Sequence, residues 1–252
     1  MTLAIKTTGL TRCFGDLRAV DSLDLRVEAG KFYGFLGPNG AGKSTTIKML
    51  TGLLAPTSGS MCILGEEVED LDKAREVKRR VGVVPEELAL FDNLTAWEYL
   101  TFIGRMYKMP MPTIQERCRE LLTMMNLDSE EKLILEYSHG MKKKLTLAAA
   151  LIPNPDLLFL DEPFEGVDAV ASRVLRDTLK RCVQRGATVF LTSHVLEIVE
   201  RLCTDVGIIV AGKLVHQDTM DEIHAAGSLE ERFLESVGSD HIEHQKLSWL
   251  ED

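Results

Sequence analysis

The sequence predicts an α/β fold with a largely parallel sheet, an antiparallel β subdomain at the N-terminus and an α-helical insertion. Three observations carry this prediction. Apolar runs alternate with helical patterns from residue 153 onward, the order that builds a parallel sheet covered on both faces. The first 36 residues instead alternate apolar and polar positions, which favours antiparallel strands. Residues 92–153 follow the helical period.

Composition limits the class of protein. The 252 residues, 45% of them hydrophobic, can bury a full core. A formal net charge of -10 argues against nonspecific nucleic-acid binding, which needs a basic face. The five cysteines include no C-x-x-C pair and indicate reduced cytosolic thiols. The first residues lack the apolar core of a signal peptide, and no apolar run approaches the roughly 18 residues of a spanning helix, so any membrane role is expected through another chain.

The elements follow in order along the chain. Leu23, Leu25 and Val27 continue an N-terminal alternation that predicts short antiparallel strands, and KFYGFLG (31–37) predicts a central strand because it is more continuously apolar. LTAWEYLTFIGRMY and IQERCRELLTMMNL place apolar residues at three- and four-residue steps, as helices do. DLLFLDEP, TVFLTSH and VGIIVAGKLV each read as a strand, and a final helix is expected from Met220 onward, including SLEERFLESVG, before a polar end.

A phosphate-binding loop is predicted between the central strand and the helix after it. GPNGAGKST (37–45) fits G-x-x-x-x-G-K-[ST] in the context that this mechanism requires. Backbone N–H groups of such a loop surround phosphate oxygens, Lys43 reaches the β- and γ-phosphates, and the Ser44 hydroxyl can hold magnesium. The alternative is a glycine turn before an ordinary helix. The predicted nucleotide-binding residues are Gly37, Pro38, Asn39, Gly40, Ala41, Gly42, Lys43, Ser44 and Thr45.

A strand ending in acidic residues is expected beside this loop. LLFLDEP supplies it, because Asp161 closes a buried apolar run and can coordinate magnesium through water. Glu162 follows directly, where a carboxylate can polarise an attacking water. The alternative is an acidic strand cap with no chemistry.

A second anion-directed feature lies in EYSHGMKKK (136–144). Ser138 and Gly140 mark the start of a helix whose bare backbone N–H groups attract anions. A plain capped helix is the alternative. Lys142, Lys143 and Lys144 face different directions on this helix, and such lysines are usually solvated.

Together these segments resemble a known family. GPNGAGKST, EYSHGMKKK, LLFLDEP, EGVD and TSH come in the order and approximate spacing of the ATP-binding subunits of ABC transporters, and the likeness covers nearly the whole chain. The resemblance implies a P-loop NTPase (RecA-like) core in which two subunits hold two ATP molecules between them. Ser138 and Gly140 would face a γ-phosphate held by the other subunit. The form YS-x-GM is similar to the signature of two-component exporters.

The same resemblance implies roles for residues elsewhere. Glu86 stands where the family has a magnesium-binding glutamine, and His194 stands where a histidine contacts the γ-phosphate and the attacking water. Asp168 would couple the two sites across the dimer, and Phe14 would stack on adenine, the alternative being an ordinary core aromatic. The segment 87–93 and the helical insertion would form a groove for a helix of a membrane subunit, unless its apolar residues are core.

The predicted protein is the ATP-hydrolysing subunit of an ABC exporter, peripheral on the cytoplasmic face of the membrane, with ATP and Mg²⁺ as cofactors. Its predicted partners are a separate transmembrane permease and a second ATP-binding subunit, with no nucleic acid. The predicted catalytic residues are Lys43, Glu162 and His194, and the predicted metal ligands are Ser44, Glu86 and Asp161.

The predicted division is 1–86 (first part of the ATP-binding core), 87–152 (helical subdomain), 153–222 (second part of the core) and 223–252 (C-terminal extension). Two alternatives stay open for the function. One is a soluble ABC-type ATPase without a membrane partner. The other is an ATP-dependent regulatory clamp with negligible hydrolysis, supported only by the off-pattern residues Glu86, His139 and Met141.

Overall fold

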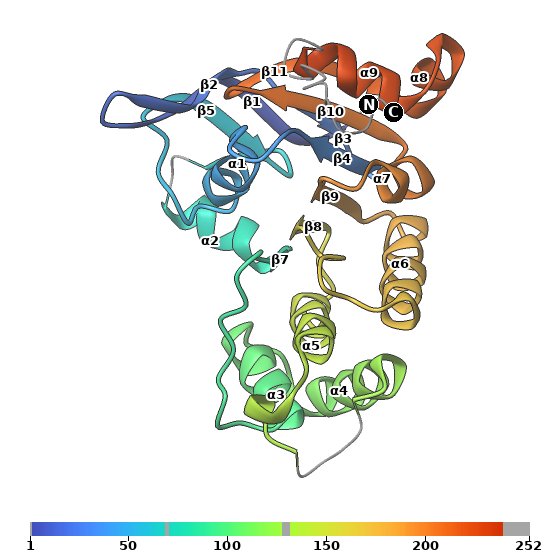
Figure 1. Ribbon diagram of the computed structural model, residues 1–252. Coiled ribbons are helices and arrows are strands. Elements are labelled where there is room, and N and C mark those ends of the chain that lie inside the picture. The colour runs from blue at the N-terminus through green and yellow to red at the C-terminus, as the bar shows by residue number, and fades with distance from the viewer. Residues whose placement is uncertain (1, 69–70, 128–131, 239–252) are drawn as a thin grey trace, which may run out of the picture.

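The computed structural model describes residues 2–68, 71–127 and 132–238, and a six-stranded sheet forms its centre (Figure 1). The strands are β4 (Phe32–Leu36), β7 (Val81–Val84), β8 (Leu157–Asp161), β9 (Thr188–Ser193), β10 (Asp205–Val210) and β11 (Lys213–Thr219). Their order is β11-β10-β4-β9-β8-β7, and all neighbours are parallel except β10 and β11. The predicted largely parallel sheet, with β4 inside it, is confirmed.

The inner strands are apolar because both faces of this sheet are covered. Every residue of β4, β8 and β9 is buried. Side chains alternate between the two faces, so Phe159 and Phe190 enter one hydrophobic core while Leu160 and Leu191 enter the other. Phe190 stacks on Tyr33, with ring centroids 5.5 Å apart, and also packs against Phe35 and Phe159.

An antiparallel sheet covers the first of these cores. It contains β1 (Leu3–Phe14), β2 (Leu17–Leu23), β3 (Arg26–Glu28), β5 (Ser58–Ile63) and β6 (Glu66–Glu67). The strand order is β2-β1-β5-β6, and β3 also pairs with β1. The expected antiparallel strands are confirmed, but β1, at 12 residues, is longer than predicted. It stays one strand because Gly9, at φ 56°, lets it bend between its pairing with β3 and its pairing with β2.

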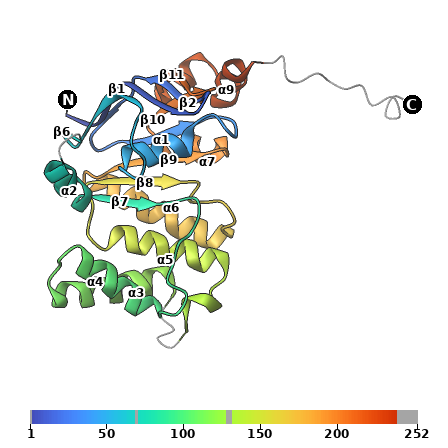
Figure 2. The ribbon, with the colours of Figure 1, turned by 90° about the vertical axis from the view of Figure 1, so that its left-hand side faces the viewer.

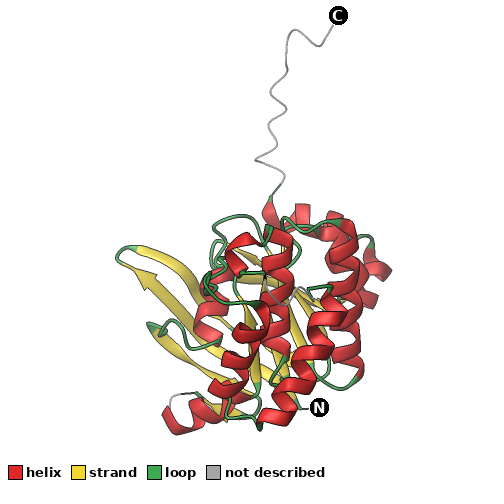
Figure 3. Cartoon of the chain, turned by 90° about the horizontal axis from the view of Figure 1, so that it is seen from below, coloured by secondary structure: helices red, strands yellow, loops and turns green. Residues whose placement is uncertain are grey.

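Helices complete the fold. They are α1 (Lys43–Leu50), α2 (Leu71–Arg79), α3 (Ala96–Met106), α4 (Met111–Met125), the 3-10 helix η1 (Ile134–Glu136), α5 (His139–Leu151), α6 (Ala169–Gln184), α7 (Leu196–Leu202), α8 (Met220–Ala226) and α9 (Leu229–Val237). The predicted helical insertion is confirmed as α3, α4 and α5, which lie together at the end of the molecule away from β1 and β2 (Figure 2). Seen from below, the helices lie mainly to the right of the strands (Figure 3).

Two boundaries differ from the prediction. The segment 206–215 is not one strand, because Ala211 and Gly212 both take positive φ and turn the chain from β10 into β11. The helix expected after residue 220 is two helices, α8 and α9, with Gly227 at φ 153° between them.

Within the part of the chain that the structure describes, no helix combines the length and the apolar character that crossing a bilayer requires. The four-part division of the chain remains a prediction. Of the predicted C-terminal extension, residues 239–252 lie outside the described residues.

Candidate functional site

The polar residues of the site follow the carboxyl ends of neighbouring parallel strands. The loop 37–42 follows β4, Glu86 lies just beyond β7, Glu162 follows β8 and His194 follows β9. Parallel strands end at the same edge of a sheet, so residues far apart in the sequence meet there. β8 is not paired with β4, because β9 lies between them in the sheet.

The loop between β4 and α1 is a tight turn, and Lys43 at its end hydrogen-bonds back to its start. Gly42 has φ 107°, and a Cβ added there would lie 2.4 Å from the carbonyl oxygen of Ala19, so the position requires glycine. Lys43 is 7% exposed, and its Nζ donates to the carbonyl oxygens of Gly37, at 2.8 Å, and Pro38, at 3.2 Å. The loop therefore places a buried ammonium among backbone groups, an arrangement that suits a phosphate.

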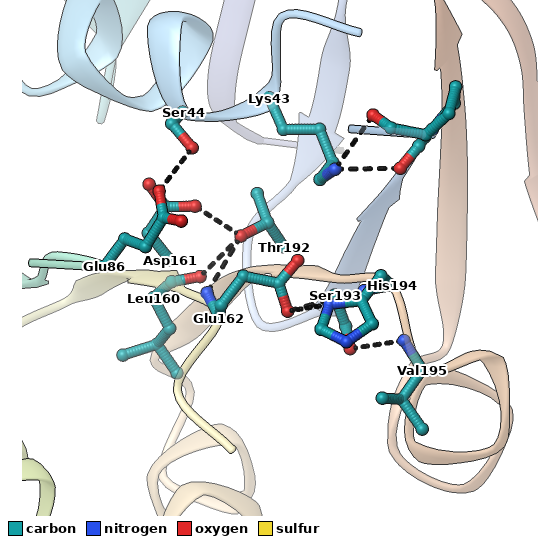
Figure 4. Close-up of polar contacts among 12 residues, drawn as sticks. Lys43, Ser44, Glu86, Leu160, Asp161, Glu162, Thr192, Ser193, His194 and Val195 are labelled. Carbon is teal, nitrogen blue, oxygen red and sulfur yellow. Dashed lines mark hydrogen bonds and ion pairs between the residues drawn. The ribbon is translucent and has the colours of Figure 1, made fainter. Parts of the chain in front are cut away.

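Thr192, on the intervening strand β9, fixes the acidic end of β8. Its Oγ1 donates to Oδ1 of Asp161 at 2.6 Å and accepts from the backbone N–H of Glu162 at 3.0 Å (Figure 4). Sequence reasoning did not select Thr192. The available signal was a threonine directly after the apolar residues 189–191 of a predicted strand, where a hydroxyl needs a partner once it is buried.

Glu162 and His194 form a pair at the mouth of the site. His194 Nδ1 lies 3.0 Å from Glu162 Oε2, and the His194 backbone N–H donates to the same oxygen at 3.4 Å. An ionised carboxylate only accepts, so the ring nitrogen is the donor in this contact. Glu162 has φ 47°, a conformation in which non-glycine residues are uncommon. The backbone therefore turns sharply at the residue predicted to act as a base.

Two of the predicted metal ligands, Ser44 at the start of α1 and Glu86 after β7, are in contact. Ser44 Oγ donates to Oε2 of Glu86 at 3.2 Å, the contact drawn at the left of Figure 4. Hydroxyl and carboxylate oxygens are hard ligands of the kind that Mg²⁺ prefers, and Mg²⁺ is commonly held by one or two carboxylates together with substrate phosphates. Ser44, Glu86 and Asp161 thus fit magnesium by their chemistry.

A cavity of about 770 Å³ joins these groups. Of the predicted site residues it is lined by Phe14, Gly37, Pro38, Asn39, Gly40, Gly42, Lys43, Ser44, Thr45, Glu86, Glu162 and His194. Ala41 and Asp161 do not line it and are both buried. Leu17, Ala19, Glu165 and Phe233 line it without having been predicted. Phe233 comes from α9, and no local motif connects that helix to the loop.

Phe14 lies at one wall of this cavity. Its side chain is 47% exposed, so the alternative of an ordinary core aromatic is wrong. The guanidinium carbon of Arg12 lies 4.6 Å from the ring centroid and covers one face of the ring.

The remaining predicted residues form a second, separate group. Ser138 caps α5, and its Oγ accepts from the backbone N–H of Met141 at 3.3 Å. Asp168 caps α6 by accepting from Val170 and Ala171, and these hydrogen bonds lower the pKa of its carboxyl. A Cβ added at Gly140 would lie 3.9 Å from Asp168 Oδ2, so the two helix starts are neighbours. None of the three predicted residues in this group lines the cavity.

Comparison with known proteins decides the family. A family model described as ABC transporter matches residues 20–165. The chain belongs to the ABC transporter family. It is 38% identical over 226 residues to the daunorubicin/doxorubicin resistance ATP-binding protein DrrA of Streptomyces peucetius, covering 89% of this chain and 68% of that protein. It is 39% identical over 225 residues to the bacitracin transport ATP-binding protein BcrA of Bacillus licheniformis, covering 88% and 72%.

The fold agrees with this membership. The solved structure of an ATP-binding subunit of an ABC transporter superposes with a TM-score of 0.87 at 28% identity, covering 93% of this chain and all of that one. The chain is therefore an ATP-binding ATPase of the ABC transporter family with a P-loop NTPase fold.

The three lysines of this ABC protein's α5 do not share one environment. Lys142 pairs with Asp92 at 3.1 Å, and Lys144 donates to the carbonyl oxygen of Met125. Lys143 is 2% exposed and donates to the carbonyl oxygen of Glu162 at 3.0 Å. The expectation that all three are solvated is wrong for Lys143. The reason is that α5 packs against β7 and α6, and Lys143 lies on the side of the helix that turns inward.

Proposed function

We propose that the chain is the ATP-hydrolysing subunit of an ABC exporter and that two copies close around two Mg-ATP molecules. The observation that carries the proposal is the separation of the two phosphate-directed groups. The loop 37–45 opens on the cavity, whereas the exposed start of α5 at Ser138 lies outside it. A second copy would bring its own Ser138 and Gly140 to the open side of this cavity. A helix start of this kind, with about half a positive charge, suits a γ-phosphate.

Within one subunit, the loop and Lys43 would bind the phosphates. We expect the Lys43 ammonium to exchange the carbonyl oxygens of Gly37 and Pro38 for phosphate oxygens, because phosphate oxygens carry negative charge and carbonyl oxygens do not. The face of Phe14 away from Arg12 is left for the adenine base. Ser44, Glu86 and Asp161 would hold magnesium, which would offset the phosphate charge.

Hydrolysis would then depend on Glu162 and His194. A carboxylate accepts a proton from an attacking water and so increases its nucleophilicity. The contact of His194 Nδ1 with Glu162 Oε2 would hold that carboxylate in one orientation. Asp168, whose carboxylate lies beside Gly140, would link the second group of residues to the partner subunit.

Dimerisation tests the proposal directly. Glu162→Gln should dimerise in Mg-ATP because hydrolysis no longer reopens the closed pair, and light scattering after size exclusion would report the mass. The double variant Glu162→Gln/Ser138→Arg should stay monomeric, since a bulky side chain would occupy the place of the phosphate. Glu162→Gln/Leu53→Arg is the matched control. It adds the same charge at Leu53, a residue of the ATP-binding part of the chain that is 72% exposed. Dimerisation of the Ser138→Arg double variant would remove α5 from the interface.

The membrane partner is the second part of the proposal. We propose a separate permease that contacts the helical insertion from the cytoplasmic side, and the relatives' names, drug resistance and bacitracin transport, support an exporter. Of the apolar residues predicted to form the groove, Leu90 packs against the core, whereas Phe91 is 53% exposed. Phe91 packs edge-on against Phe102, itself exposed, with ring centroids 5.4 Å apart. Exposed aromatic residues of this kind suit a helix contact.

Phe91→Asp should lose the permease while keeping ATP-dependent dimerisation, because a carboxylate would be buried without a partner in the contact. The measurement is copurification of a polytopic membrane protein with the tagged chain from detergent-solubilised membranes. Leu53→Asp, an equally polar change outside the insertion, should retain it. If both variants copurify with the same membrane protein, Phe91 does not belong to the contact.

A further inference from the structure

The buried Lys143 has no part in the function described so far. It lies on α5 five residues after Ser138, about one and a half turns into the helix. Its Nζ reaches out of the helix to the carbonyl oxygen of Glu162 at 3.0 Å, and this contact is buried. Burying a charged lysine costs free energy unless the charge is paired or hydrogen-bonded. The contacts of Lys143 must therefore offset this cost.

The compensation comes from the acidic site itself. Burial lowers the pKa of Lys143, whereas the carboxylates of Glu165, Asp161, Glu162 and Glu86 raise it. Acidic residues of the cavity and of the end of β8 therefore act electrostatically on Lys143. Its hydrogen-bond acceptor, the carbonyl oxygen of Glu162, follows β8 directly, so the Lys143 side chain runs from α5 to the carboxyl edge of the central sheet.

The accepting carbonyl belongs to the residue with the unusual backbone. Glu162, at φ 47°, begins a turn in which the backbone N–H of Glu165 donates to the same carbonyl oxygen at 3.3 Å. Thr192 holds the N–H of Glu162, and Lys143 holds its carbonyl. Both backbone polar groups of this residue are thus fixed by side chains from other elements. An uncommon backbone conformation persists when its surroundings determine it in this way.

We propose that Lys143 is a positioning residue, whose ammonium anchors the carbonyl of Glu162 and so directs the Glu162 carboxylate toward His194. The inference rests on the proposed function, because it takes Glu162 as the group that activates water. Lys143 also connects two places. The same helix that begins at Ser138 holds the backbone of Glu162, so a phosphate bound at the helix start of one subunit can influence the carboxylate of that subunit's own site.

Backbone exchange in the nucleotide-free protein tests the anchor without any turnover. Lys143→Met keeps a long apolar stem but removes the donor, and hydrogen–deuterium exchange should become faster in peptides covering residues 161–168. Lys142→Met is the matched control, since Lys142 is partly exposed and pairs with Asp92. It should leave those peptides unchanged. Equal exchange in both variants and the unmodified protein would overturn the proposal.

Kinetics separates positioning from a general structural role. Lys143→Met should lower kcat for ATP by about 10-fold to 100-fold, the range expected when a reacting group is misplaced, with KM nearly unchanged. Lys143→Arg restores a donor and should recover most of the rate and the slow exchange. A fall in kcat that Lys143→Arg does not rescue, or one matched by Lys142→Met, would contradict the role. If the unmodified protein lacks ATPase activity, the proposed function fails, while the exchange result still tests the anchor.

Discussion

Replacing Glu162 with glutamine is expected to lower the rate of ATP hydrolysis by about 10²-fold to 10⁴-fold, the usual contribution of a positioned general base. The amide has the same shape and its oxygen can still accept from the backbone N–H of His194. It cannot take a proton from water. Substrate binding should survive, because the phosphate contacts of the loop 37–45 are untouched.

The measurement is a comparison of kcat, from phosphate release, with the ATP dissociation constant of the same variant. Glu165→Gln is the control, since Glu165 lines the same cavity three residues further on but makes no contact with His194 among the described hydrogen bonds. Its rate should change far less. A rate near normal in Glu162→Gln, or an equal loss in both variants, would show that another group activates the water.

Replacing Phe190 with alanine is expected to lower the free energy of unfolding by about 3–5 kcal/mol, as for other buried aromatic residues. The ring is fully buried in the central strand β9 and packs against Tyr33, Phe35 and Phe159. Its loss leaves a cavity under the sheet and removes contacts with three other rings. The free energy of unfolding of a typical domain is only about 5–15 kcal/mol, so this single change would remove a large fraction of it.

Denaturant titration of the nucleotide-free protein measures the effect through the transition midpoint and slope. Phe102→Ala removes the same ring from a position that is 41% exposed, so it should cost much less. Phe190→Leu should fall between the two, because leucine fills part of the space. A loss below about 1 kcal/mol in Phe190→Ala would mean that the core around Phe190 repacks to fill the cavity.

Much of the fold followed from local patterns. The apolar runs in KFYGFLG (31–37) and at 157–160 predicted a central and a buried strand, because only a sheet covered on both faces buries every residue of a strand. TVFLTSH predicted a strand, and the structure shows that this strand is also fully buried. The phosphate loop was equally predictable, since its glycines, Lys43 and Ser44 act within nine contiguous residues. The hairpin at Ala211 was missed because its turn interrupts an apolar run without proline or a strong turn pair.

The sequence by itself determined which chemistry each motif is predicted to perform: a loop for phosphate, hydroxyl and carboxylate oxygens for magnesium, and a helix start for an anion. Only the tertiary structure decided which residues meet. It placed β9 between β4 and β8, so that Thr192 holds both Asp161 and Glu162. It also buried Lys143 while its two neighbours stayed accessible. The residues of a motif are close together in the sequence, so the motif can be recognised locally. Burial depends on which helices and strands pack together, and that packing is a property of the whole chain.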